Sequence, residues 1–288
     1  MRKNITLLFL LSITLSFAQT ERTIPVGYYA TATGSGYILK TQLYNIIKNN
    51  TNSSSGPDYG DLWTLYTQPA FRDTYYDNDN SLLDIYSEIL TAQETIGNYP
   101  YTSTSEQCGN YTGEGSCYNR EHVLPQSVFS SNYPMQSDAH FVLPSDGYVN
   151  GQRSDLPFGV VGSASWTSSN GSKKGSNLNS GYSAGYSGTV FEPIDEFKGD
   201  IARALLYFGT RYENQISGWN YVMFNSGTGI NAPVYKSTFL NILLTWHMSD
   251  PVSPRALKHV QELEEIACLG IITTTLLFII QRTDISCF

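Results

Sequence analysis

The residues best suited to chemistry fall in one stretch near the middle of the chain. His122 and His140 are two of only four histidines, and they lie among asparagine, aspartate, glutamate and arginine residues. Residues 118–127 read Tyr-Asn-Arg-Glu-His-Val-Leu-Pro-Gln-Ser. Residues 137–153 read Ser-Asp-Ala-His-Phe-Val-Leu-Pro-Ser-Asp-Gly-Tyr-Val-Asn-Gly-Gln-Arg. The stretch therefore supplies a proton acceptor, oxygen ligands and cations within a short length of chain.

These side chains match the needs of phosphodiester hydrolysis. A base must take a proton from water, a metal must neutralise the phosphate, and a cation helps to position it. His122 suits the base because its ordinary pKa lies near neutrality. Glu121 and Asn150 supply hard oxygen ligands, which suit Mg²⁺ or Ca²⁺. Asn150 and Arg153 are three residues apart on a predicted helix, so one face can carry both a metal ligand and a phosphate clamp.

One feature of the stretch resists this interpretation. Glu121 and His122 are adjacent, and on a regular strand they would point to opposite faces. We therefore expect either an irregular backbone there, which Pro125 would fit, or a site that wraps around the strand edge. The simpler alternatives also stand, because a lone Glu-His pair is usually incidental and an asparagine at a helix start is usually a cap.

The elements around these residues follow from hydrophobic spacing. Apolar side chains recur at helical intervals in three segments, and a fourth helix is expected after a serine N-cap at Ser145. Short β-rich runs predict two strands, the second stopped by Pro144. Residues 163–188 are nearly all Ser, Gly, Asn, Thr and Tyr, so they form either a long surface loop or a glycine-rich hairpin. The expected helices span 39–48, 146–152, 198–212 and 238–248, and the expected strands span 82–86 and 141–143. The fold class is α+β, a mostly helical mixed domain around a small sheet.

The first 18 residues read as a secretory signal peptide. Arg2 and Lys3 precede an almost wholly apolar stretch, and Ala18 is the expected cleavage point. The stretch is too short for a comfortable membrane span. We therefore expect a secreted protein, extracellular or periplasmic, with no membrane segment in its mature form.

Cysteine usage agrees with an oxidising compartment. Cys108 and Cys117 lie close together in a loop rich in Gly, Tyr and Ser, and we expect them to form a disulfide. Cys268 and Cys287 lie in an unusual C-terminal segment. There is no Cys-x-x-Cys pair to suggest a structural zinc site.

The two central segments together resemble the endonuclease I family. The resemblance rests on residues 119–127, on Asp138-Ala-His140 and on residues 144–154, and it continues in residues 84–87, 170–173 and 191–200. The family comprises periplasmic and secreted bacterial nucleases with a ββα-metal (His-Me finger) active site. The resemblance covers roughly residues 24–253 and implies a nuclease domain over 19–253.

The resemblance assigns roles to the central residues. His122 matches the general base, and Glu121 and Asn150 match the ligands of one divalent ion, Mg²⁺ or alternatively Ca²⁺ or Mn²⁺. Arg153 matches an arginine near the phosphate. The family segment around Asp138 usually ends in a second histidine or an asparagine, where this chain has Phe141, and we interpret His140 as structural support. An arginine that the family places between the two blocks has no counterpart in residues 127–137.

The function implied is nonspecific endonucleolytic cleavage of DNA, with RNA left open, by a monomer that binds the phosphate backbone. The formal charge of −8 opposes this, because nucleic-acid binders usually carry a basic surface. One alternative is a noncatalytic secreted protein that binds a surface or carbohydrate through the Tyr-rich residues 163–188. Another is a metalloprotease or other zinc hydrolase, which the absence of a His-Glu-x-x-His motif disfavours.

The C-terminal residues 254–288 depart from the family pattern. They contain the apolar run 269–281, which three threonines interrupt. A one-base shift of the codons would permit a family-like Asn-Pro-Phe-Ile, so we expect a frameshift in the gene or its sequencing after Ser253. The alternatives are an authentic apolar element packed on the core and a membrane anchor, and the run is too short for the anchor.

Overall fold

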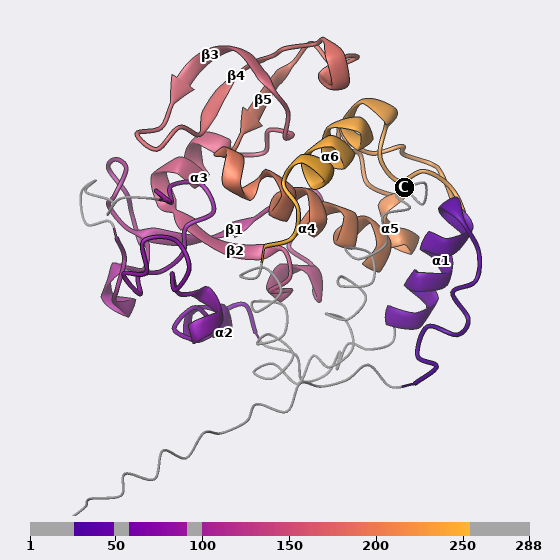
Figure 1. Cartoon of the computed structure of the whole chain (residues 1–288), viewed down its shortest axis with the longest axis horizontal. Helices are drawn as coiled ribbons and strands as arrows, with labels where there is room; N and C mark the ends of the chain where they lie inside the picture. Colours follow the sequence, from indigo (N-terminus) through magenta and orange to yellow (C-terminus); the bar gives the residue numbers. More distant parts are fainter. Residues whose placement is uncertain (1–25, 49–57, 91–99, 254–288) are drawn as a thin grey trace, which may run out of the picture.

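The computed structural model describes residues 26–48, 58–90 and 100–253 (Figure 1). The expected signal peptide, the segment 254–288 and its two cysteines lie outside the described residues, so those expectations stay predictions. In the described part of the chain, no helix is long and apolar enough to cross a membrane.

The described chain is a mixed α+β domain with six α-helices and two antiparallel sheets. The helices are α1 (Gly36–Ile47), α2 (Asp61–Leu65), α3 (Gly147–Arg153), α4 (Lys198–Arg211), α5 (Glu213–Ile216) and α6 (Ser237–Ser249). The strands are β1 (Tyr118–His122), β2 (Val142–Asp146), β3 (Val161–Thr167), β4 (Lys173–Asn177) and β5 (Thr189–Glu192). The α+β class is confirmed, but the expectation of one small sheet was wrong, because residues 161–192 form a second sheet of their own.

Helix α4 is the centre of the core. Twelve of its fourteen residues are buried, including charged ones, so it is enclosed on nearly every side. Helix α6 packs along it, as Figure 1 shows. The Phe208 ring of α4 lies 4.8 Å from the ring of Phe141, which leads into β2. Burial of one such aromatic side chain contributes about 1.5–3 kcal/mol, so α4 ties the first sheet to the helical layer.

Among the described residues the first sheet consists of β1 and β2, and helix α3 follows β2 directly. Pro144 lies inside β2 opposite Arg120, although we expected it to end the strand. The Val123 N–H donates to the Phe141 carbonyl, and antiparallel ladders alternate between bonded and non-bonded pairs. Arg120 and Pro144 therefore form a non-bonded pair, and the missing N–H of Pro144 breaks no ladder bond.

Two further local expectations were wrong. The N-cap of α3 is Asp146 and not Ser145, since the Asp146 carboxylate accepts the N–H groups of Tyr148 and Val149. Residues 82–86 make a single bridge and a turn in place of a strand. In that turn the Asp84 side chain accepts the Tyr86 N–H at 2.8 Å, which competes with strand pairing.

The second sheet has the order β3-β4-β5 and resolves the two alternatives for residues 163–188 in favour of a hairpin. Strand β3 is its largely exposed outer strand. Glycine is required at Gly175 of β4, because a Cβ there would collide with the Ser163 backbone of β3. A Gly- and Ser-rich sequence can therefore form strands where close backbone approach excludes larger side chains.

Candidate active site

Strands β1 and β2 and helix α3 form a ββα unit that carries the four predicted site residues. Glu121 and His122 lie at the end of β1, opposite Leu143 and Val142 of β2. Asn150 and Arg153 lie one turn apart on α3. The Arg153 Nη1 atom is 3.2 Å from Glu121 Oε1 and donates to the His122 carbonyl at 3.0 Å. The last turn of α3 is therefore fixed against the end of β1.

Glu121 is a buried carboxylate with one oxygen in use. Its Oε1 atom accepts the Tyr86 hydroxyl at 2.7 Å and faces Arg153. Burial raises the pKa of Glu121, while the Arg153 charge and the Tyr86 hydrogen bond act in the opposite direction. Neither of these contacts involves Oε2. That atom is placed to bind a cation, which would also offset the desolvation of the carboxylate.

His122 is held in one tautomer by the backbone. Its Nε2 atom lies 3.0 Å from the Gln136 carbonyl oxygen, which can only accept a hydrogen bond. Nε2 therefore carries the proton in the neutral ring, and Nδ1 is the bare nitrogen. Burial lowers the pKa of His122 to about 4, which the Gln136 hydrogen bond only partly opposes. At neutral pH the ring is uncharged and Nδ1 is able to accept a proton.

The adjacency of Glu121 and His122 is accommodated without an irregular strand. The β1–β2 register is unbroken through both residues, so the expected irregular backbone is absent. The Glu121 side chain contacts Tyr86 and Arg153, whereas the His122 ring packs on Phe129 and Phe141. The pair therefore occupies two sides of the end of β1, and a site that uses both residues would have to wrap around the strand edge.

Asn150 fits the second metal ligand. It is half-buried on α3, and within the described residues its side-chain amide makes no hydrogen bond. Asp146 already caps the helix, so Asn150 is not needed as a cap. The uncommitted amide oxygen of Asn150 and the Oε2 atom of Glu121 are both hard donors, the type that Mg²⁺ and Ca²⁺ prefer. These two residues fit a divalent ion.

Arg153 is committed to the protein interior. It is 1% exposed, and besides Glu121 it donates to the carbonyls of His122, Val123 and Ser154. These contacts satisfy backbone oxygens where the β1 ladder ends. They hold the Arg153 guanidinium against Glu121 and the backbone, and they lend no support to the predicted phosphate clamp.

Arg120 is the cation closer to solvent in this region. Its guanidinium carbon lies 3.5 Å from the centre of the Tyr59 ring and 4.2 Å from that of Trp63, and Nη1 donates to the Tyr59 carbonyl at 2.8 Å. Arg120 and His122 are two residues apart on β1, so their side chains share a face. The Arg120 charge also helps to lower the His122 pKa. The Arg120 guanidinium is therefore a preorganised cation on the same face of β1 as His122.

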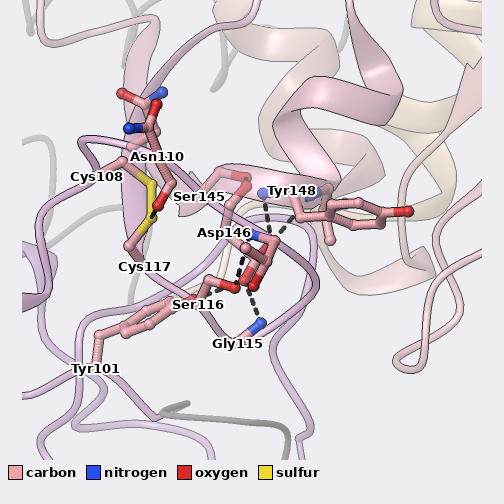
Figure 2. Close-up of a disulfide and its surroundings, with 12 residues drawn as sticks. Tyr101, Cys108, Asn110, Gly115, Ser116, Cys117, Ser145, Asp146 and Tyr148 are labelled. Carbon is pink, nitrogen blue, oxygen red and sulfur yellow. Dashed lines mark hydrogen bonds between the residues drawn. A yellow bond between two sulfur atoms is a disulfide. The ribbon is translucent and has the colours of Figure 1, made fainter.

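The expected disulfide is confirmed and braces the start of α3. Cys108 and Cys117 are bonded, with their Cα atoms 5.0 Å apart (Figure 2). The Cys117 carbonyl accepts the N–H of Gly147, the first residue of α3. A Cβ at Gly147 would collide with the Cys108 sulfur, so only glycine fits there. In Figure 2 the capping residue Asp146 lies beside this bridge, where it also accepts the Gly115 N–H at 2.7 Å.

The segment around His140 is structural. The Asp138 carboxylate accepts a hydrogen bond from Nδ1 of His140 at 2.8 Å. It also accepts hydrogen bonds from the hydroxyls of Tyr207 and Tyr212 at 2.9 and 2.6 Å. This network anchors the segment to α4. Phe141 is fully buried against Phe208, which explains how an apolar residue occupies this position. These contacts agree with the supporting role expected for His140.

Two site partners were missed by reasoning from the sequence. Tyr86 holds the metal-ligand candidate Glu121, and its segment 84–87 was already noted as similar to the family. The Gln136 carbonyl orients His122, but it belongs to the backbone, so no side-chain pattern could indicate it.

Comparison with known proteins covers the whole ββα unit. A family model described as Endonuclease I matches residues 35–266, beyond the limit of residue 253 expected from the motifs. The chain is 30% identical to the extracellular ribonuclease of Bacillus amyloliquefaciens over 233 residues, which are 79% of this chain and 67% of that protein. It is 28% identical to the extracellular ribonuclease of Bacillus subtilis (strain 168) over 236 residues, which are 80% and 68% of the two chains.

Proposed function

This chain belongs to the endonuclease I family, and we propose that it cleaves nucleic acid with His122 as the general base and one divalent ion on Glu121 and Asn150. Family membership makes it a nuclease that hydrolyses phosphodiester bonds, which removes the noncatalytic binding protein as an alternative. The observation that carries the proposal is the bare Nδ1 of His122, which the hydrogen bond between Nε2 and the Gln136 carbonyl leaves unprotonated in the neutral ring.

The protein's own residues supply the proton transfer. The neutral His122 ring accepts a proton from water at Nδ1, and the imidazolium is held through Nε2–H to the Gln136 carbonyl. Glu121 stays oriented by Tyr86 and Arg153 throughout. A divalent ion bound by Glu121 and Asn150 would neutralise charge at the scissile phosphate.

The substrate includes RNA as well as DNA. Water is the nucleophile in this scheme, so a ribose 2′-hydroxyl is not needed for the reaction and does not prevent it. The two Bacillus relatives are named extracellular ribonucleases, which supports RNA as a substrate here. Contacts to phosphates, without base readout, would allow both polymers to bind.

Arg120 is the proposed phosphate contact. We propose it in place of Arg153, which is buried, because Arg120 shares a face of β1 with His122. Stacking between Tyr59 and Trp63 limits the rotamers of its long side chain. A local cation of this kind reconciles phosphate binding with the net charge of −8.

The protein is proposed to act outside the cytoplasm as a monomer. The relatives are named extracellular, and the Cys108–Cys117 bond fits an oxidising compartment. The N-terminal signal peptide predicted over 1–18 would direct export.

A plasmid-nicking assay tests the proposal, with a structured RNA as a second substrate and with EDTA and restored Mg²⁺ as the two metal conditions. We expect both substrates to be cut at many positions, cutting to stop in EDTA, and Mg²⁺ to restore it. Cutting that continues in EDTA would exclude the metal mechanism. Cleavage of RNA alone, ending in 2′,3′-cyclic phosphates, would exclude water as the nucleophile.

A further inference from the structure

Three aromatic side chains that the proposed reaction does not use lie together at α3. Tyr148 belongs to α3, Tyr111 comes from the loop 108–117, and Trp166 comes from β3. The centre of the Tyr148 ring is 6.1 Å from that of Tyr111 and 6.4 Å from that of Trp166. Tyr111 is 40% exposed, and the other two are half-buried. These three residues, called the aromatic track below, therefore form a connected group that solvent partly reaches.

Tyr111 places one end of the aromatic track beside the proposed metal ligand Asn150. Its ring lies over Gly147 and Gly151, where an added Cβ would come within 3.0 and 2.4 Å of Tyr111 atoms. Successive residues of an α-helix point about 100° apart, so Gly147 and Gly151 lie on the helix surface between Tyr148 and Asn150. The aromatic track therefore runs from β3 around α3 to the surface next to Asn150.

A cation accompanies the aromatic track. Helix α3 lies next to the second sheet (Figure 1), and the Lys174 Nζ atom of β4 donates to the Gln152 Oε1 atom of α3 at 2.6 Å. Lys174 is paired with Trp166 in the β3–β4 ladder, and Gln152 is one turn beyond Tyr148 on α3. Among the described residues, Lys174 forms no ion pair with a carboxylate. Its charge is therefore available to a phosphate.

Two links hold the loop that carries Tyr111 in position. The Cys108–Cys117 disulfide closes this loop. Within it, the Glu114 carboxylate accepts the Ser169 N–H at 2.8 Å, which ties the loop to the turn between β3 and β4. Side chains that are already held in position lose less conformational entropy when they bind a ligand. The aromatic track is therefore preorganised.

We propose that the aromatic track and Lys174 bind a single-stranded segment of the nucleic-acid substrate beside the cleavage site. Bases stack on the rings, and Lys174 contacts a phosphate. This inference rests on the proposed function, because Asn150 marks the point of cleavage only if it holds the divalent ion. Stacking on aromatic side chains tolerates every base, so this binding needs no base readout.

The proposal specifies the form of the substrate. In a duplex the bases are stacked on one another and are paired, so their faces are not open to side chains. A single strand is able to splay its bases onto aromatic rings. We therefore expect the protein to bind single-stranded RNA or DNA more tightly than the corresponding duplex.

The test measures binding to a fluorescein-labelled single-stranded DNA oligonucleotide and to the duplex that it forms with its complement. Fluorescence anisotropy is recorded in EDTA, so the comparison does not depend on the divalent ion. Cleavage of both probes in Mg²⁺ is measured in parallel. A failure of the binding inference is thereby distinguished from a failure of the proposed mechanism.

The variants separate ring stacking from packing. Trp166→Leu and Tyr148→Leu each remove a ring and keep an apolar side chain, and Trp166→Phe keeps a ring. Tyr182→Leu is the matched control, because Tyr182 is 41% exposed, close to the 40% of Tyr111. Tyr182 lies in a turn, Gly181–Ser183, that packs on α6, away from the aromatic track. Thermal melting shows whether each variant is folded.

We expect Trp166→Leu and Tyr148→Leu each to weaken single-strand binding by about 5- to 100-fold, the usual effect of losing one stacking ring. Trp166→Phe should recover most of the affinity, since any aromatic face stacks on a base. Lys174→Gln should lower the slope of log affinity against log salt by about one, as expected for one phosphate contact. Tyr182→Leu should bind like wild type. If one Leu variant is unfolded, the other and Lys174→Gln decide the question.

Three results would overturn the proposal. The first is equal affinity of the wild type for the single strand and the duplex, and the second is single-strand binding that both Leu variants retain. The third is a dimer that Trp166→Leu dissociates in sedimentation, which would assign the rings to a contact between two copies of the chain. Strand binding as expected without cleavage in Mg²⁺ would support this binding site and contradict the proposed mechanism.

Discussion

The Nη1 atom of Arg153 lies 3.2 Å from the Oε1 atom of Glu121, and both side chains are buried. The two residues come from α3 and β1, so this ion pair joins the helix of the ββα unit to its first strand. The same arginine satisfies carbonyls at the end of β1. The Arg153 guanidinium thus holds the metal-ligand candidate Glu121 and also binds the backbone carbonyls at the end of β1.

Arg153→Met should destabilise the protein by about 3–5 kcal/mol, because it leaves the Glu121 carboxylate buried and uncompensated. Urea unfolding measures this change. Adding Glu121→Gln to Arg153→Met should recover part of the loss, since the unpaired charge is then gone. If Arg153→Met alone had normal stability but bound the substrate more weakly, the result would instead support Arg153 as a phosphate clamp.

Glu121→Gln should abolish cleavage while the protein stays folded, since the amide can still accept the Tyr86 hydroxyl. It removes the charge that would bind the divalent ion. Activity at saturating Mg²⁺ and Mn²⁺ binding by calorimetry are the measurements. Asp155→Asn is the control, because Asp155 is an exposed carboxylate whose charge acts on Glu121. Near-normal cutting by Glu121→Gln would remove Glu121 from the metal site.

His122→Ala should lower the cleavage rate by about 10² to 10⁴, the usual contribution of a positioned base. Metal binding should be retained, because the His122 ring contacts Gln136 and aromatic rings and is not one of the proposed metal ligands. Single-turnover rates and calorimetry separate the two effects. His247→Ala, a half-buried histidine on α6, is the matched control and should cut normally. Loss of ion binding by His122→Ala would make His122 a ligand.

His122 should make the protein less stable as the pH falls. Its pKa is lowered to about 4 in the folded state, against an ordinary 6.5, so the unfolded chain binds the proton more tightly between these values. The stability contributed is complete above the ordinary pKa and is lost as the pH falls toward 4. It amounts to roughly 2 kcal/mol between pH 7 and pH 5.

The measurement compares wild type with His122→Asn in urea unfolding at both pH values. This comparison is needed because Asp84, whose pKa burial raises to about 8, acts in the opposite direction in both proteins. Equal losses of stability in the two proteins would mean that the folded-state pKa of His122 is not lowered.

Replacing both Cys108 and Cys117 by serine should cost about 3 kcal/mol of stability, from the entropy of closing a loop of this length. Thermal unfolding measures the loss. Activity per folded molecule should fall as well, because the bridge braces the start of α3. Mass spectrometry of the secreted protein should find the bond formed, and two free thiols would show that the pairing is wrong.

Much of the local structure was readable from the sequence because it depends on neighbours along the chain. The apolar stripe of Ile201, Leu205 and Phe208 predicted α4 nearly to its observed ends. The turn at Asp84 was misread as a strand, because a local side-chain hydrogen bond outcompeted the β-propensity of its neighbours. The second sheet was left open as loop or hairpin, since close backbone packing at Gly175 is a tertiary property.

The sequence by itself determined which groups the proposed site can use: a histidine, a carboxylate and an amide, in two short blocks typical of one family. Only the tertiary structure decided what each group is free to do. Arg153 is buried against Glu121 and backbone carbonyls, and a backbone carbonyl fourteen residues away leaves Nδ1 as the unprotonated nitrogen of the neutral His122 ring. The reason is physical, because protonation state, tautomer and availability depend on desolvation and on partners brought together by folding, which composition and spacing do not encode.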